Sequence, residues 1–367
     1  MKVRYSYLKQ QFSNCEDLWK DLKKFVATGD FTLGKELFKF EKRFAKLIGT
    51  KYAIGVNSGT DAIKLSLKSI GIKPGDEIIT AANTFVATVG AITELGAIPK
   101  FVDCDDTFCM NVNQVENKIS KKTKAIVPVH FTGYMTNMPE LKKIAKKYDL
   151  PIVEDACQSI LGAINNKNAG TWGITGAFSL HPLKNINVWS DGGVITTNDK
   201  KTYNHIKLLR NHGLIDRDTV KINGYNSRLD TFQAVVGNWL LPNAKKIANQ
   251  RIINAKYYDK KLSKIKQIKI PNRPKNMKVV YHLFIVFAEK RDQLYKYCLR
   301  KGIEAKVHYP KPMYLQDSLK YLKHKKNDFP ITDEHCKKII SFPCDQHLSL
   351  RQQNYIVKTV ENFYKKN

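Results

Sequence analysis

PIVEDACQ, residues 151–158, is an apolar run that ends on two acidic side chains, Glu154 and Asp155. Such a run is typical of a buried strand whose carboxyl end opens onto a site. Amphipathic stretches, for example 61–70 and 140–148, alternate with several runs of this kind. The runs are residues 52–56, 77–80, 100–102, 125–129, 151–154, 177–180 and 193–196. This alternation predicts an α/β fold with a mostly parallel sheet flanked by helices.

The pattern changes after residue 200. It predicts a long helical region at about 200–260, then a strand at 279–288, a helix at 291–301 and a strand at 304–308. The last three elements predict a small unit of βαβ type. We therefore expect a large domain, 1–245, and a smaller C-terminal α/β domain, 246–367, with residues 1–30 able to pack on the smaller one.

Composition narrows the class of protein. The chain has 367 residues and is 43% hydrophobic, which is enough for a buried core. Its apolar runs fall short of the ~20 residues that span a bilayer, and its N-terminus does not resemble a signal peptide. Seven scattered cysteines without Cys-x-x-Cys spacing argue against disulfides or a metal site. Such cysteines fit a reducing compartment, so we expect a cytoplasmic protein. The net charge of +29 is spread along the chain, so we expect no nucleic-acid or membrane partner.

A lysine lies where one strand gives way to a turn. Lys184 follows the strand predicted at 177–180, and Pro182 blocks continuation of that strand. An amine among apolar neighbours loses its proton more easily, and amine nucleophiles form Schiff bases with carbonyl compounds. Taken alone, Lys184 is better explained as an ordinary surface lysine in a loop, because the chain has 62 basic residues.

Two further segments supply complementary groups. Asp155 follows a strand, where a carboxylate can keep a pyridine nitrogen protonated, as pyridoxal phosphate requires. Ser58, Gly59 and Thr60 precede an amphipathic helix, and the amides and hydroxyls at such a helix start can bind a phosphate. Each segment also has a plainer interpretation, because Asp155 and Ser58 could simply cap helices.

Together these segments resemble the DegT-type (DegT/DnrJ/EryC/StrS) sugar aminotransferases, a pyridoxal-phosphate family of fold type I. The resemblance runs nearly from end to end. It rests on GDFTLG at 29–34, FE at 40–41, SGT at 58–60, EDACQ at 154–158, SLHPLK at 179–184, GG at 192–193, GYNSRL at 224–229 and VHYP at 307–310. Six or more motifs in the same order make it specific.

The resemblance implies roles for individual residues. Lys184 corresponds to the Schiff-base lysine and Asp155 to the partner of the pyridinium nitrogen. The implied cofactor contacts are Ser58, Gly59, Thr60 and Ser179 at the phosphate, Phe85 stacked on the ring, Gln158 near the ring hydroxyl, and Asn226 reaching the phosphate of the neighbouring subunit. The implied substrate contacts are Thr32, His181, Arg228, His308 and Tyr309. No metal is implied.

The activity implied is transfer of an amino group from L-glutamate to a keto-sugar linked to dTDP or UDP, in amino-sugar and polysaccharide biosynthesis. The cofactor would pass through its pyridoxamine form in a homodimer with shared sites. Lysine rather than histidine at position 184 favours transamination over dehydration. The segments 191–193 and 308–310 favour amination at carbon 3 of a deoxyhexose. The alternatives are amination at carbon 4, or a non-catalytic regulator that binds nucleic acid.

Overall fold

The computed structural model describes residues 1–366. Its strands are β1 (Tyr52–Val56), β2 (Glu77–Ala81), β3 (Ile98–Val102), β4 (Thr123–Val127), β5 (Val153–Asp155), β6 (Ala163–Ile164), β7 (Lys167–Asn168), β8 (Thr175–Ser179), β9 (Gly193–Thr197), β10 (Ile268–Lys269), β11 (Met277–Lys278), β12 (Phe284–Ala288) and β13 (Ile339–Phe342). Its α-helices are α1 (Leu8–Gln11), α2 (Glu16–Val26), α3 (Lys35–Ile48), α4 (Gly59–Ser69), α5 (Val86–Thr93), α6 (Met138–Lys147), α7 (Lys200–Leu209), α8 (Thr231–Leu240), α9 (Ala244–Leu262), α10 (Arg291–Arg300), α11 (Pro330–Lys338) and α12 (Leu350–Lys366).

Two sheets lie edge to edge at the centre of the larger unit. One has the order β3-β2-β4 and the other β1-β9-β8-β5, and parallel bridges such as Ile126 to Ile152 join them. The pairs of β2 with β3, β2 with β4 and β5 with β8 are parallel, whereas β9 runs antiparallel to β1 and β8. The predicted α/β fold with a mostly parallel mixed sheet is confirmed.

Neighbouring residues on these strands face opposite layers. Ile78 and Ala125 join the apolar cluster beneath α4, whereas Ile79 and Ile126 join the cluster on the other face. Both faces of the sheet are therefore buried. This explains why its strands read as continuous apolar runs rather than as alternating patterns.

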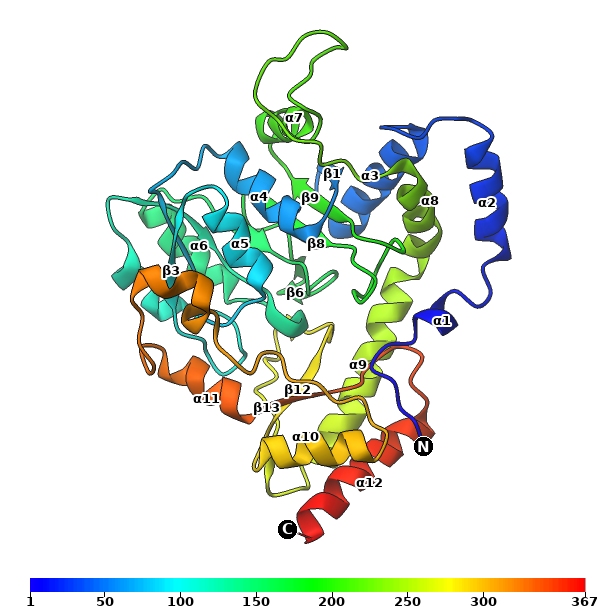
Figure 1. Ribbon diagram of the computed structural model, residues 1–367, viewed down its shortest axis with the longest axis vertical. Coiled ribbons are helices and arrows are strands. Elements are labelled where there is room, and N and C mark those ends of the chain that lie inside the picture. The colour runs from blue at the N-terminus through cyan, green and yellow to red at the C-terminus, as the bar shows by residue number, and fades with distance from the viewer. Residues whose placement is uncertain (367) are drawn as a thin grey trace.

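The helical region predicted at about 200–260 is built from α7, α8 and α9. Residues 210–230 form a loop between α7 and α8, and Figure 1 shows it projecting beyond α7 at the top of the molecule. Gly213 has φ +74°, and a Cβ on Gly224 would lie 2.3 Å from the amide nitrogen of Gly213. This close backbone packing in left-handed geometry is incompatible with a helix, so a loop interrupts the predicted helical region between α7 and α8.

The smaller unit differs from the βαβ expectation. Its sheet has the order β10-β12-β13, and β12 pairs antiparallel with both neighbours. The strand predicted at 304–308 does not form, because the Ala305 amide donates to the Ile303 carbonyl at 2.8 Å in a tight turn. Only a single bridge, Lys306 to Ser341, links this segment to β13 within residues 1–366.

The N-terminal segment contacts both units. Val3 bridges to Ile303, the Tyr5 amide donates to Glu304 at 2.8 Å, and α2 packs on α8. Helix α9 runs from the upper to the lower half of the molecule in Figure 1. The expected domain boundary at 245/246 falls inside α9, and the division into two domains stays a prediction. All seven cysteines are free thiols. Within residues 1–366, every helix is too short or too polar to span a bilayer.

Candidate active site

A cavity of about 360 Å³ opens at the carboxyl ends of β5 and β8, beside the start of α4. Most of the residues singled out in the sequence line it: Ser58, Gly59, Thr60, Phe85, Asp155, Gln158, Ser179, His181, Lys184, His308 and Tyr309. Thr32, Asn226 and Arg228 do not line it. Residues 308–309 lie after α10, in the part of the chain expected to form the smaller domain.

Asp155 ends β5 and is buried. Its Oδ2 accepts a hydrogen bond from Thr88 Oγ1 at 2.6 Å, and its Oδ1 accepts one from the Cys157 amide at 3.1 Å. The next element in the chain is the short strand β6, so Asp155 does not cap a helix. The carboxylate is thus held by two donors on the wall of the cavity.

Lys184 lies in a turn whose backbone is fixed by a bond from its amide to the His181 carbonyl at 2.8 Å. Burial lowers the pKa of the Lys184 ammonium, while Cys157 and Asp155 act in the opposite direction. Because a lower pKa enlarges the neutral fraction, this lysine is better suited than an exposed one to act as a nucleophile or a base.

The start of α4 approaches the end of β8 closely. Ser58 is the N-cap, and its hydroxyl accepts from the Asp61 amide at 3.1 Å. A Cβ on Gly59 would lie 2.7 Å from Ser179 Cβ and 3.0 Å from Cys157 Sγ, so only glycine fits there without displacement. The first amides of a helix have no intrahelical acceptor, and they face an anion favourably.

The side chain of Gln158 has a defined orientation. Its Oε1 accepts from the backbone amide of Thr132 at 2.8 Å, so its NH₂ group is the donor side that faces Tyr309 and the cavity. Thr132 has φ +62°, an uncommon conformation for a β-branched residue. Strain of this kind is often found beside functional sites.

The segment after α10 adds an imidazole, that of His308, and an aromatic ring, that of Tyr309. The rings of Tyr309 and Phe85 lie 5.9 Å apart, and His308 Nδ1 is 2.8 Å from Ser341 Oγ. Burial, followed by the charges of Lys306 and Lys184, lowers the pKa of His308 to about 4. His308 is therefore neutral at pH 7.

Some cavity residues were missed in the sequence. Cys157, Asp191 and His282 line it, and Thr88 lies behind Asp155. Burial, with Lys184 as the next cause, lowers the pKa of His282 well below its ordinary value. No spacing signal pointed to His282, because it lies within the apolar run 279–288.

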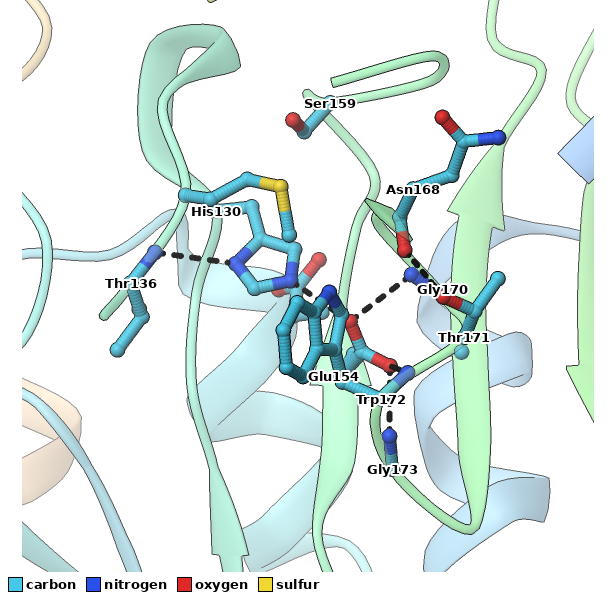
Figure 2. A network of polar contacts seen from close by, with 12 residues as sticks. His130, Thr136, Glu154, Ser159, Asn168, Gly170, Thr171, Trp172 and Gly173 are labelled. Carbon is cyan, nitrogen blue, oxygen red and sulfur yellow. Dashed lines mark hydrogen bonds and ion pairs between the residues drawn. The ribbon is translucent and has the colours of Figure 1, made fainter. Parts of the chain in front are cut away.

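Glu154, the other acid of the opening motif, lies in a separate buried network. Figure 2 shows its carboxylate accepting from the backbone amides of Gly170, Trp172 and Gly173 at 2.7–2.9 Å. It is also 2.9 Å from His130 Nε2. Glu154 thus ties β5 to the loop before β8, whereas Asp155 serves the cavity.

A lysine, a buried carboxylate and a helix start thus lie around one cavity at the carboxyl edge of a mixed α/β sheet, an arrangement that suits pyridoxal phosphate. The chain matches the model of the DegT/DnrJ/EryC1/StrS aminotransferase family over residues 13–361 and belongs to that family. It is a pyridoxal-phosphate-dependent aminotransferase.

Individual relatives are similar over nearly their whole length. The "Pleiotropic regulatory protein" of Geobacillus stearothermophilus is 34% identical, over 100% of this chain and 99% of the relative. The dTDP-3-amino-3,4,6-trideoxy-alpha-D-glucose transaminase of Streptomyces venezuelae is 32% identical, over 92% of this chain and 89% of the relative. The solved structure of S. venezuelae DesV in complex with a ketimine intermediate has a TM-score of 0.96 and 31% identity, covering 99% and 98% of the two chains.

Proposed function

We propose that this enzyme transfers an amino group from L-glutamate to carbon 3 of a keto-deoxyhexose linked to dTDP or UDP, for amino-sugar and polysaccharide biosynthesis. The observation that carries the proposal is the single cavity that Lys184, Asp155 and the Gly59 helix start line together. The S. venezuelae relative, named for a dTDP-3-amino sugar, supports carbon 3. Carbon 4 is the alternative. A cytoplasmic location belongs to the same proposal.

The cavity's donor set fits pyridoxal phosphate. Lys184 Nζ would hold the cofactor covalently and Asp155 would face the ring nitrogen. The remaining contacts would be Ser58, Gly59, Thr60 and Ser179 at the phosphate, the Gln158 NH₂ at the ring hydroxyl, and Phe85 on the ring face. When bound, the cofactor supplies an electron sink and carries the amino group between donor and acceptor.

The chain's own groups would then act in order. Once the donor's amine has displaced it from the cofactor, Lys184 Nζ, with its lowered pKa, would take the proton from the α-carbon of the donor and later return one at the sugar. Asp155 keeps the ring nitrogen protonated throughout. The neutral imidazole of His308, with His181 and Tyr309, orients the sugar.

Asn226, Arg228 and Thr32 would act across a homodimer. Asn226 and Thr32 are exposed and lie outside their own chain's cavity, and Asn226 belongs to the 210–230 loop. Loops can reach into a partner's cleft, and a two-fold dimer would create two equal sites.

Trapping the cofactor tests the assignment of the lysine. After borohydride reduction, mass spectrometry should find the pyridoxyl group on Lys184, and Lys184→Ala should abolish both the adduct and turnover. Lys167→Ala is the control, because burial also lowers the pKa of Lys167 but this residue lies outside the cavity. An adduct on another lysine would contradict the assignment. A protein without a cofactor absorbance band that changes on adding glutamate would instead favour the regulatory alternative.

Subunit mixing tests the shared site. Lys184→Ala chains mixed with Asn226→Ala chains form dimers with one doubly damaged site and one intact site. Partial recovery of activity is expected after exchange. If activity does not recover although exchange is verified independently, each chain completes its own site.

A further inference from the structure

Two threonine hydroxyls lie in series behind Asp155. Thr88 Oγ1 is 2.6 Å from Asp155 Oδ2, and Thr84 Oγ1 is 2.6 Å from Thr88 Oγ1. Both threonines are buried, with 0% of Thr88 and 3% of Thr84 exposed. They flank Phe85, the N-cap of α5, whose carbonyl accepts from the Thr88 amide at 3.2 Å. One turn of chain therefore presents Phe85 to the cavity and the Thr88 hydroxyl, backed by that of Thr84, to Asp155.

Counting protons fixes the direction of these bonds. A hydroxyl has one proton to donate, and an ionised carboxylate only accepts. Thr88 therefore donates to Asp155, so the bond between the two threonines must use the proton of Thr84, for which Thr88 Oγ1 at 2.6 Å is a nearer acceptor than the Phe85 carbonyl at 3.1 Å. Such a chain is polarised toward its acceptor and stabilises the charged carboxylate more than a single hydroxyl would.

Both oxygens of Asp155 are thereby held in place. Oδ2 accepts from Thr88 and Oδ1 from the Cys157 amide at 3.1 Å, so the carboxylate cannot rotate without losing a donor. Each oxygen keeps a free lone pair, which leaves room for a further donor such as a protonated ring nitrogen.

We propose that Thr88, supported by Thr84, is a positioning residue that holds Asp155 ionised and correctly oriented toward the cofactor's ring nitrogen. The inference rests on the role proposed for Asp155. The hydrogen bond from Thr88 stabilises the ionised form of the Asp155 carboxylate. Without this donor, the proton shared by the carboxylate and the ring nitrogen moves toward the carboxylate. The ring then becomes a weaker electron sink.

The test compares Thr88→Val, which keeps the shape but removes the hydroxyl, with Thr88→Ser, which keeps the hydroxyl. In the holoenzyme, Thr88→Val should lower kcat by roughly ten- to a hundredfold, which is the rate equivalent of one hydrogen bond to a charged group. The KM for the amino donor should change little, and Thr88→Ser should restore kcat. The matched control is Thr93→Val, on the same helix, whose hydroxyl bonds only to the Gly90 carbonyl at 3.3 Å.

Two readouts are independent of turnover. In Thr88→Val, the pH at which the absorbance of the bound cofactor changes should move, and cofactor affinity measured by titrating the apoprotein should fall. Neither should change in Thr93→Val. Thr84→Val should shift both in the same direction by less, and it serves if Thr88→Val does not fold.

The outcomes separate the two proposals. Asp155→Asn is measured in parallel, and near-normal turnover in that variant removes the ring-nitrogen role and the threonine chain with it. If Asp155→Asn is impaired but Thr88→Val has wild-type kcat and spectra, the threonine chain alone is refuted. Equal impairment of Thr88→Ser and Thr88→Val would show a packing role and overturn the inference as well.

Discussion

Replacing Glu154 by glutamine should destabilise the protein far more than its small change in shape suggests. Glu154 is fully buried, and its two oxygens divide four donors between them. Oε1 accepts from the Trp172 and Gly173 amides at 2.7 and 2.8 Å, and Oε2 accepts from the Gly170 amide at 2.9 Å and contacts His130 Nε2 at 2.9 Å. Figure 2 shows these donors converging on the carboxylate.

The histidine cannot adapt to the change. The Thr136 amide donates to His130 Nδ1 at 3.3 Å, so the ring proton lies on Nε2 and is donated to Glu154. A glutamine offers one oxygen and one NH₂ group, so in either orientation two N–H donors face another donor. At about 1–3 kcal/mol for each buried group left unsatisfied, the loss should be about 2–6 kcal/mol of unfolding free energy.

Urea unfolding of the apoprotein, followed by far-ultraviolet circular dichroism, would measure this loss. The control is Glu140→Gln, which breaks an exposed pair with Lys143 at 2.9 Å and should cost less than about 1 kcal/mol. If Glu154→Gln unfolds at the same urea concentration as Glu140→Gln, the reasoning about convergent donors is refuted.

Three further changes test other parts of the structure. Arg210→Met leaves Glu41 buried without its partner and should cost about 3–5 kcal/mol in urea unfolding, part of which Glu41→Leu should restore. Burial lowers the pKa of His335 from 6.5 to about 4, so the unfolded chain binds a proton in this window that the folded chain does not, and stability falls as pH falls. The unfolding free energy that the protein loses between pH 7 and pH 5 should therefore be about 2 kcal/mol smaller in His335→Phe than in the wild type. If the urea midpoint falls by the same amount in both proteins between these two pH values, this reasoning is contradicted. Gly59→Ala should weaken pyridoxal phosphate binding at least about tenfold in a titration of the apoprotein, because its Cβ would lie 2.7 Å from Ser179 Cβ, and unchanged affinity would count against the close approach of α4 to β8.

The strands of the central sheet could be predicted because each is buried on both faces. The predicted run 52–56 matches β1 at both ends, and the runs at 77–80 and 193–196 match β2 and β9 to within one residue. The direction of β9 could not be predicted, since an apolar run is the same for a parallel and an antiparallel strand. That direction depends on the path of the chain through 181–192, the segment that carries Lys184.

Elements were predicted less well where the backbone is shaped by contacts distant in sequence. At 210–230 Gly213 and Gly224 pack backbone to backbone and divert the chain between α7 and α8. At 304–308 the residues favour a strand, yet Val3 and Ser341 take the pairing on either side of a tight turn. Neither partner can be recognised locally.

The same distinction explains which site residues were found. Lys184, Asp155 and Gly59 could be predicted because each follows or begins a regular element, and the carboxyl ends of parallel strands meet at one edge. Thr88 and His282 could not, because their roles depend on which atom lies opposite them in space. Thr88 looks like an ordinary helix residue until Asp155 Oδ2 is placed 2.6 Å away. The groups proposed to bind the cofactor are thus marked by their position along the chain, whereas the groups that contact them from behind are visible only in the fold.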